Sequence, residues 1–279
     1  MRMKKTAKIF PGLLFLFVVL TPGLSAQGHF EFGFHYGNWS IDILRGMIED
    51  GINDALESEL KDRILDDLKQ DYPTLQEVSY DQDLSFDSGG ENYGFEIRWY
   101  PGGHSGSFSL GLSVEKTTMR VSIPQVSASL SMEELITSRT ADFQGDADGE
   151  FLIEPLSFHM SLRWDIMTAW RLHPYITLGF GAATGTALEE GEVSYSYSGD
   201  LDIQGEETKH YQDSETKTLK EFKDEYEQEE GEEFFIPGFL PFIQLNLGLK
   251  GVLTENLHVL VDAGVWDGFL LRGGVAVRF

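Results

Sequence analysis

The chain has 279 residues, no cysteine and a net charge of −25, with 46 acidic residues against 21 lysines and arginines. Without cysteine it has neither disulfide cross-links nor a lipidated amino-terminal cysteine. Nucleic acid is excluded as a partner, because a surface this acidic repels the phosphate backbone.

The first 26 residues have the features of a secretory signal peptide. Four basic residues between Arg2 and Lys8 precede an apolar run at 9–20, and small residues then lead to Ala26. The apolar run is too short to cross a bilayer as a helix, which needs roughly 20 residues. We therefore expect cleavage after Ala26 and a mature chain of residues 27–279.

Eight later segments alternate apolar residues with small or polar ones, which is typical of strands with two different faces. In chain order they cover about 30–37, 93–100, 108–115, 156–165, 175–182, 243–250, 257–264 and 269–279. The first sets Phe30, Phe32 and Phe34 on one face, and Glu31 and His35 on the other. Each segment is close to the roughly 9–11 residues that a tilted strand needs to cross a bilayer.

The last segment ends the chain on an aromatic residue. Val275 and Val277 share one face, Arg272 and Arg278 share the other, and Phe279 is the final residue. If the apolar face meets lipid, the arginines point into a closed barrel, because a membrane reverses which side of a sheet is wet. Such an ending resembles the terminal signal of bacterial outer-membrane barrels. Val275, Val277 and Phe279 are therefore the predicted assembly signal, with the barrel assembly machinery as a predicted partner.

The connections between these segments are alternately long and short. The long ones lie at 38–91, 116–150 and 184–239. The short ones lie at 101–106, 166–174 and 251–256. Outer-membrane barrels combine short periplasmic turns with long outer loops, so the long segments are predicted outer loops, two of them strongly acidic. Aromatic residues near strand ends would form an interfacial girdle: Phe30, Trp99, Phe108, Trp164 and Phe279.

On these strands and the terminal signal, the chain resembles the small outer-membrane barrels of the OmpA/OmpW kind. The resemblance implies an all-β fold, an eight-stranded antiparallel up-and-down transmembrane barrel. It also implies a monomer in the bacterial outer membrane, surrounded by outer-membrane lipid. The alternative is a soluble antiparallel barrel or sandwich, which alternates in the same way. The signal peptide, the terminal Phe279 and the aromatic strand ends favour the membrane.

The predicted inward faces carry equal numbers of acidic and basic side chains. We expect these ten to form an ion-pair network in the lumen: Glu31, Glu96, Arg98, Glu115, Arg163, Asp165, Lys250, Asp262, Arg272 and Arg278. An eight-stranded barrel is only wide enough for its own side chains or one small ligand, and buried charges must pair. A closed lumen is the favoured interpretation, and an ion path is the alternative.

The first long connection has apolar residues spaced as one face of a helix over 40–71, with Ser40 as a cap and Pro73 beyond its end. We expect this helical insertion to bury its apolar stripe against neighbouring loops. The alternative is a lid over the barrel mouth.

Three other patterns bear on chemistry. The acidic run at 225–233 is interpreted as a solvated, mobile loop, and binding of divalent cations is the alternative. The segment Asp146–Glu150 is interpreted as a turn rather than a calcium-binding loop. His159 and Ser161 match the His-x-Ser pair of the lipid A deacylase family. Their parity places both inside, however, and no suitable glutamate stands on the next strand. No catalytic residue is therefore assigned, and no cofactor is expected.

These observations predict a non-enzymatic outer-membrane barrel whose acidic outer loops serve surface recognition, adhesion or envelope integrity. A transport channel for small or apolar solutes is the first alternative. A lipid A-modifying enzyme is a less favoured one.

Overall fold

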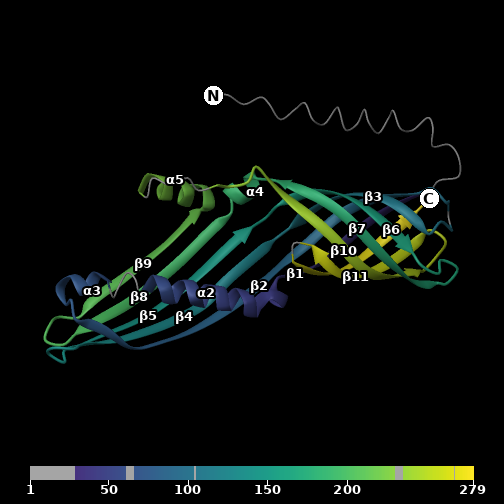
Figure 1. Cartoon of the computed structure of the whole chain (residues 1–279). Coiled ribbons are helices and arrows are strands. Elements are labelled where there is room, and N and C mark those ends of the chain that lie inside the picture. The colour runs from purple at the N-terminus through teal and green to yellow at the C-terminus, as the bar shows by residue number, and fades with distance from the viewer. Residues whose placement is uncertain (1–28, 61–65, 104, 230–234, 267) are drawn as a thin grey trace, which may run out of the picture.

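The computed structural model of the chain describes residues 29–60, 66–103, 105–229, 235–266 and 268–279. The predicted signal peptide at 1–26 lies outside these residues. The described part is elongated, with a barrel at one end and a long sheet flanked by helices at the other (Figure 1).

Eight antiparallel strands close into the barrel. In their order around it they are β1 (His29–Ser40), β12 (Phe269–Arg278), β11 (Leu257–Trp266), β10 (Phe239–Val252), β7 (Leu172–Thr184), β6 (Leu156–Asp165), β3 (Phe108–Thr117) and the second half of β2 (Leu75–Tyr100). Pairing of β1 with β2, from His29 opposite Tyr100 to Trp39 opposite Gly90, closes the ring. The predicted eight-stranded antiparallel barrel is confirmed.

The two faces of the barrel wall differ in the way that the alternation predicts. In β7, Ile176, Leu178 and Phe180 are exposed on the outside, whereas Tyr175 and Thr177 are buried inside. A shift of the register by one residue would exchange these faces, so the pattern of side chains specifies the register wherever one face is buried.

Beyond one end of the barrel, the wall continues as an open antiparallel sheet, which we call the extension. Its strands, in spatial order, are the first half of β2, β4 (Met119–Glu134), β5 (Thr140–Ile153), β8 (Glu192–Ile203) and β9 (Lys209–Thr218). The helices are η1 (Asp42–Leu44), α2 (Arg45–Leu60), α3 (Asp66–Asp71), α4 (Thr186–Glu189) and α5 (Leu219–Glu229). The three long connections are thus built largely of strands and helices rather than irregular loops.

The prediction of a turn at Asp146–Glu150 is wrong. This segment lies inside β5, where Asp148 pairs with Ser196 of β8 and Gly149 with Tyr195. Its acidic side chains point to one face of the sheet and its small residues to the other. The segment therefore has the alternation of a strand, although its inward side chains are too short to show a hydrophobic pattern.

The acidic run after β9 is partly helical rather than a loop. Thr218 and Glu221 form a reciprocal cap at the start of α5, since the Thr218 N–H donates to Glu221 Oε2 at 2.8 Å and the Glu221 N–H donates to Thr218 Oγ1 at 3.2 Å. Glu225 and Glu227 lie on this helix. The remaining acids at 230–233 lie outside the described residues.

The single helix predicted over 40–71 is divided into η1, α2 and α3, with 61–65 outside the described residues. α2 packs along the extension part of β2 (Figure 1). The Gln82 amide donates to Asn53 at 2.7 Å, and the Phe86 N–H donates to Glu49 Oε1 at 3.2 Å. The helix therefore lies along the neighbouring strand of the extension, but its apolar residues at 48, 52 and 56 are only half-buried.

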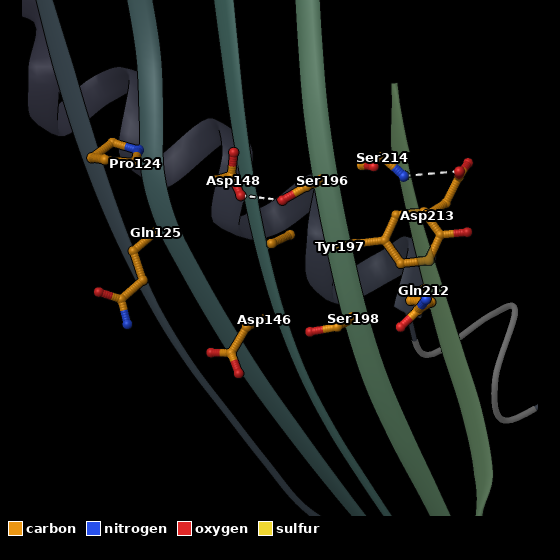
Figure 2. Close-up of a pocket in the computed structure, with 11 residues that line it drawn as sticks. Pro124, Gln125, Asp146, Asp148, Ser196, Tyr197, Ser198, Gln212, Asp213 and Ser214 are labelled. Atoms are coloured by element: carbon orange, nitrogen blue, oxygen red, sulfur yellow. Dashed lines mark hydrogen bonds between the residues drawn. The ribbon is translucent and has the colours of Figure 1, made fainter. Parts of the chain in front are cut away.

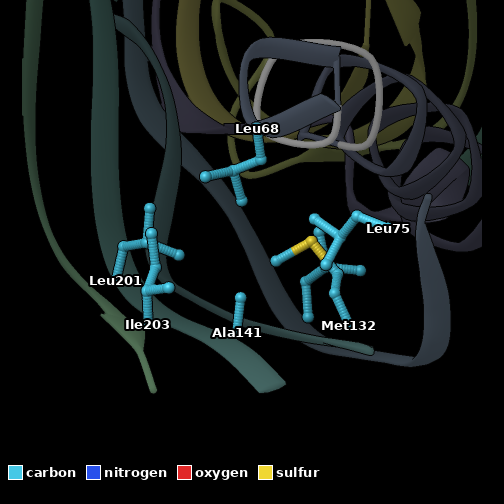
Figure 3. Close-up of a cluster of buried hydrophobic side chains, with 7 residues drawn as sticks. Leu68, Leu75, Met132, Ala141, Leu201 and Ile203 are labelled. Atoms are coloured by element: carbon cyan, nitrogen blue, oxygen red, sulfur yellow. The ribbon is translucent and has the colours of Figure 1, made fainter. Parts of the chain in front are cut away.

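Two apolar clusters hold the parts together. The first, which we call the junction layer, lies where the barrel meets the extension and contains Trp39, Met119, Ile153, Ala183, Phe242 and Leu270. The second, the tip core, contains Leu68, Leu75, Leu130, Met132, Ala141, Leu201 and Ile203. In Figure 3, Leu68 of α3 points onto the sheet residues of the tip core, so α3 covers the end of the extension.

Candidate functional site

The barrel interior contains three groups of charged side chains, the first centred on Glu31. Three residues approach its Oε2 atom: Lys250 with Nζ at 2.6 Å, Arg278 with Nη2 at 2.9 Å and Nε at 3.1 Å, and His258 with Nδ1 at 2.9 Å. Tyr100 accepts a hydrogen bond from Lys250 Nζ at 3.0 Å and donates one to Asp165 Oδ2 at 3.1 Å. Because β1 and β10 are not neighbours, the bond between Glu31 and Lys250 crosses the lumen.

The second group joins Glu96 to two arginines. Arg98 binds both carboxylate oxygens of Glu96, with Nε at 2.6 Å and Nη2 at 2.8 Å, and its Nη2 also donates to Ser161 at 2.6 Å. Arg163 Nη2 lies 3.3 Å from Glu96, and Arg163 Nε donates to Thr177 at 3.2 Å. A two-pronged arginine–carboxylate contact of this kind fixes both side chains in one orientation.

The third group is centred on Arg272, which lies between two acids. Its Nε donates to Asp262 Oδ1 at 2.9 Å, and its Nη1 lies 3.5 Å from Glu115 Oε2. His35 Nε2 lies 3.1 Å from the same Glu115 oxygen, and the Tyr175 hydroxyl donates to Asp262 at 2.6 Å. Each acid of this group therefore has the Arg272 guanidinium and a hydroxyl donor beside it, since the Ser113 hydroxyl donates to Glu115 Oε1 at 2.9 Å.

The structure places all ten side chains predicted for the lumen inside the barrel, and each lies in ion-pair contact with an opposite charge. Sequence reasoning did not single out their other hydrogen-bond partners, which include Tyr100, Tyr175, His258, Asn92 and Asn246. These residues share the inward parity, which could have placed them in the lumen. Nothing in the sequence marks them as hydrogen-bond partners of particular acids.

Large side chains fill the barrel from wall to wall. Arg98, Tyr100, Tyr175 and Lys250 are each at most 1% exposed. At the end next to the extension, the apolar side chains of the junction layer fill the barrel, and Phe242 among them is 1% exposed. A solute that entered the lumen would have to break ion pairs and displace the junction layer, so the arrangement suits a closed barrel.

His159 and Ser161, the pair weighed as catalytic, are both buried in the lumen. His159 Nε2 lies 2.6 Å from Ser157 Oγ, while Ser161 accepts its bond from Arg98. Neither side chain faces the outside of the barrel, where an enzyme acting on lipid would need it. Among the described residues, no group of three or more His, Cys, Asp or Glu is arranged to hold a metal ion.

The outside of the barrel is apolar and exposed. Val275 is 50% exposed and Phe279 is 65% exposed, while Val277 is half-buried. Phe279 closes the terminal strand against β1, because its N–H donates to the Phe30 carbonyl at 2.8 Å and its ring meets that of Phe32 edge-on at 6.1 Å. None of the helices in the described ranges is long and apolar enough to cross a membrane.

The face of the extension that continues this outer surface is polar, and we call it the polar face. Two rows cross all five strands: Asp83, Ser127, Asp146, Ser198 and Gln212, and beside them Asp81, Ser129, Gln144, Asp200 and His210. The rows contain no lysine or arginine. Shallow grooves of about 670 and about 270 Å³ lie on this face, and Figure 2 shows the larger one spanning β4, β5, β8 and β9 with the helix behind the sheet.

No known family model matches the chain, and no curated protein matches it. The solved structures that are similar to the chain include the following three. The translocator domain of the autotransporter NalP from Neisseria meningitidis is 8% identical over 97% of this chain and 95% of its own, with a TM-score of 0.19. The Ralstonia pickettii toluene transporter TbuX is 6% identical over 92% and 90%, with a TM-score of 0.20. The transport unit of the autotransporter AIDA-I from Escherichia coli is 6% identical over 91% and 90%, with a TM-score of 0.19. Similarities this weak carry no argument about this chain.

Proposed function

We propose that the chain is a non-enzymatic barrel of the bacterial outer membrane that holds its extension outside the cell for surface recognition or adhesion. The apolar outer wall supports the membrane position. Exposed Leu, Phe, Ile and Val side chains alternate with buried charged, polar or small residues along the barrel strands, which is the reverse of a soluble barrel in water. Exposed apolar surface of this extent marks contact with a membrane or another protein, and its place all around a closed barrel supports the membrane.

The contrast between the filled lumen and the exposed polar face carries the functional part of the proposal. Every charged side chain predicted for the lumen is engaged in an ion pair, and the junction layer lies across one end. The polar face, in contrast, offers carboxylates, hydroxyls and amides around two shallow grooves. Functional groups on a rigid scaffold are available to a partner, whereas groups used to fill a core are not.

The terminal strand supports the route to the membrane. Val275 and Phe279 project from the outer wall, where the barrel assembly machinery would meet them, and β12 is hydrogen-bonded along its length to β1 and β11. On this proposal the resemblance to the OmpA/OmpW barrels applies to the barrel alone, since the extension is a separate feature of this chain.

Single cysteines test which end of the molecule faces outward, since the chain contains none of its own. We expect Ser198→Cys, on the exposed polar face, to react with a membrane-impermeant maleimide on intact cells. Glu255→Cys, in the exposed turn between β10 and β11, should react only after the outer membrane is permeabilised.

The readout is the labelled fraction of each variant before and after permeabilisation. Equal labelling of both positions on intact cells, or labelling of Glu255→Cys alone, would contradict the proposed orientation. Folded protein is verified in each case by the resistance of the barrel to urea.

A further inference from the structure

The extension has two edge strands, β2 and β9, which differ in how their outward backbone groups are hydrogen-bonded. The edge on β2 is covered, because the Phe86 N–H donates to Glu49 Oε1 at 3.2 Å and the Ser88 N–H to Asp42 Oδ1 at 3.2 Å. Burial opposes the ionisation of Asp42, but bonds from Ser88 and the charge of Arg45 outweigh it and lower its pKa below 3.8. The carboxylate therefore stays charged and keeps this edge capped at neutral pH.

The other edge is β9, and no further strand pairs with it in the described part of the chain. The N–H groups of Ser214 and Thr218 donate to side chains, Asp213 Oδ1 and Glu221 Oε2, rather than to β8. Alternate residues of a strand direct their backbone groups to the same side, so those of His210, Gln212 and Thr216 point to the open edge as well. An open edge of this kind can accept another strand.

The charge of β9 distinguishes it from the rest of the acidic extension. β8 carries Glu192, Asp200 and Asp202 and no basic residue. β9 carries two acids and two bases, Asp213, Glu215, Lys209 and Lys217. The one open edge is therefore also electrically balanced, so a second acidic molecule could approach along it without net repulsion.

The order of these charges fits β9 of a second copy in antiparallel pairing. If Gln212 lies opposite Gln212 of the second molecule, Lys209 lies opposite Glu215 twice, and Tyr211 lies opposite Asp213 twice. Centring the pair on Asp213 instead would oppose Asp213 to itself and Lys209 to Lys217. Centring it on Tyr211 would oppose Lys209 to Asp213 but Glu215 to Glu207, whereas the pair centred on Gln212 opposes Glu207 to Lys217. Opposite charges on facing residues stabilise a strand pair and like charges destabilise it, so the charges favour the register centred on Gln212.

We propose that β9 of one molecule pairs antiparallel with β9 of a second, centred on Gln212, and joins the two extensions into one continuous sheet. Antiparallel strands direct the two barrels to opposite ends of this sheet. The paired molecules therefore sit in two facing membranes, and the contact is a homotypic adhesion between cells. This inference rests on the proposed outward orientation of the extension, and it replaces the expected monomer by two complete barrels in contact.

Cysteine cross-linking of the full-length protein in vesicles, with the extension outside, tests the register. In Gln212→Cys the two cysteines face each other with Cα atoms roughly 5.5 Å apart, which a disulfide can span. In Ser214→Cys, the matched control two residues away, they lie about 14 Å apart and cannot be joined. After mild oxidation we expect at least about ten times more covalent dimer from Gln212→Cys, on the same distance argument. Equal or absent cross-linking of the two variants would overturn the proposal.

Charge exchange provides an independent test that does not depend on a disulfide. Vesicles that carry Lys209→Glu should cluster about ten times less than wild type, because two attractive pairs become repulsive. Glu215→Lys should cluster equally poorly, and a mixture of the two vesicle populations should cluster again. Lys220→Glu on α5 makes the same change of charge away from the edge and should cluster like wild type.

Clustering of Lys209→Glu at the wild-type level, or no rescue in the mixture, would refute the pairing. If Ser198→Cys is labelled on intact cells but Gln212→Cys gives no dimer, the pairing alone fails. If Ser198→Cys is not labelled, the proposed orientation fails first.

Discussion

Glu31→Gln is expected to lower the free energy of unfolding by about 3–5 kcal/mol, the cost of leaving buried charges without their partner. Glu31 is 1% exposed and contacts Lys250 and Arg278 directly. The amide keeps the shape of the side chain but removes its charge, so both cations stay buried with one acid fewer. The measurement is urea unfolding of the reconstituted barrel, followed by tryptophan fluorescence.

Glu154→Gln is the matched control. Glu154 forms an ion pair with Lys116 at 2.7 Å, but both side chains are more than a third exposed. Water screens such a pair, and its loss should cost about 1 kcal/mol or less. Losses of equal size at Glu31 and Glu154 would show that the lumen is wet, which is incompatible with a closed network.

Leu178→Arg is expected to cost about 2–4 kcal/mol, as for a charge facing lipid near the middle of a bilayer. Leu178 is 47% exposed, halfway along the outer face of β7. In a soluble barrel an exposed leucine tolerates this change to within about 0.5 kcal/mol, so the variant separates the two environments. Urea unfolding in lipid bilayers gives the required free energy.

Thr184→Arg is the control on the same face of the same strand. Thr184 is exposed at the end of β7 next to the extension, where the cost should fall to about 0–1 kcal/mol. A cost at Leu178 no greater than that at Thr184 would contradict the membrane position of the barrel wall.

The barrel was predictable from the sequence because its two faces have different surroundings. Apolar residues face outward and polar or charged residues face the lumen, so the period-two pattern is strong. Phe32 and Phe34 on one face and Glu31 on the other leave a single way to place β1. The same alternation places Arg278 on the lumen face of β12, where the structure pairs it with Glu31 on the adjoining strand. Ion pairs between adjacent strands are therefore the part of the lumen network that is closest to the sequence pattern.

Contacts across the lumen could not be predicted in the same way. Lys250 reaches Glu31 from a strand that is not adjacent, so the contact depends on how far each strand is staggered around the ring. Stagger is a property of the closed barrel and has no local signal in the sequence. For the same reason, Tyr100 could be placed inside but not beside Lys250 and Asp165.

The extension was missed because its strands are poor in the residues that mark strands. β5 alternates Asp146 and Asp148 with Ala147 and Gly149, a composition typical of loops. β5 is a strand because it pairs with β4 on one side and with β8 on the other. This stabilisation comes from the neighbouring strands and not from the local propensity of its residues. Helical structure within 40–71 was predictable because its apolar spacing is local, but its division into η1, α2 and α3 was not.

Single-channel recording of the wild-type protein in planar bilayers tests the central claim most directly, namely that the lumen is closed and the extension is the functional surface. With all ten lumen charges in ion pairs and the junction layer across one end, we predict no stable, discrete conductance steps after insertion. Reproducible open-channel steps would contradict the account and favour a transport channel.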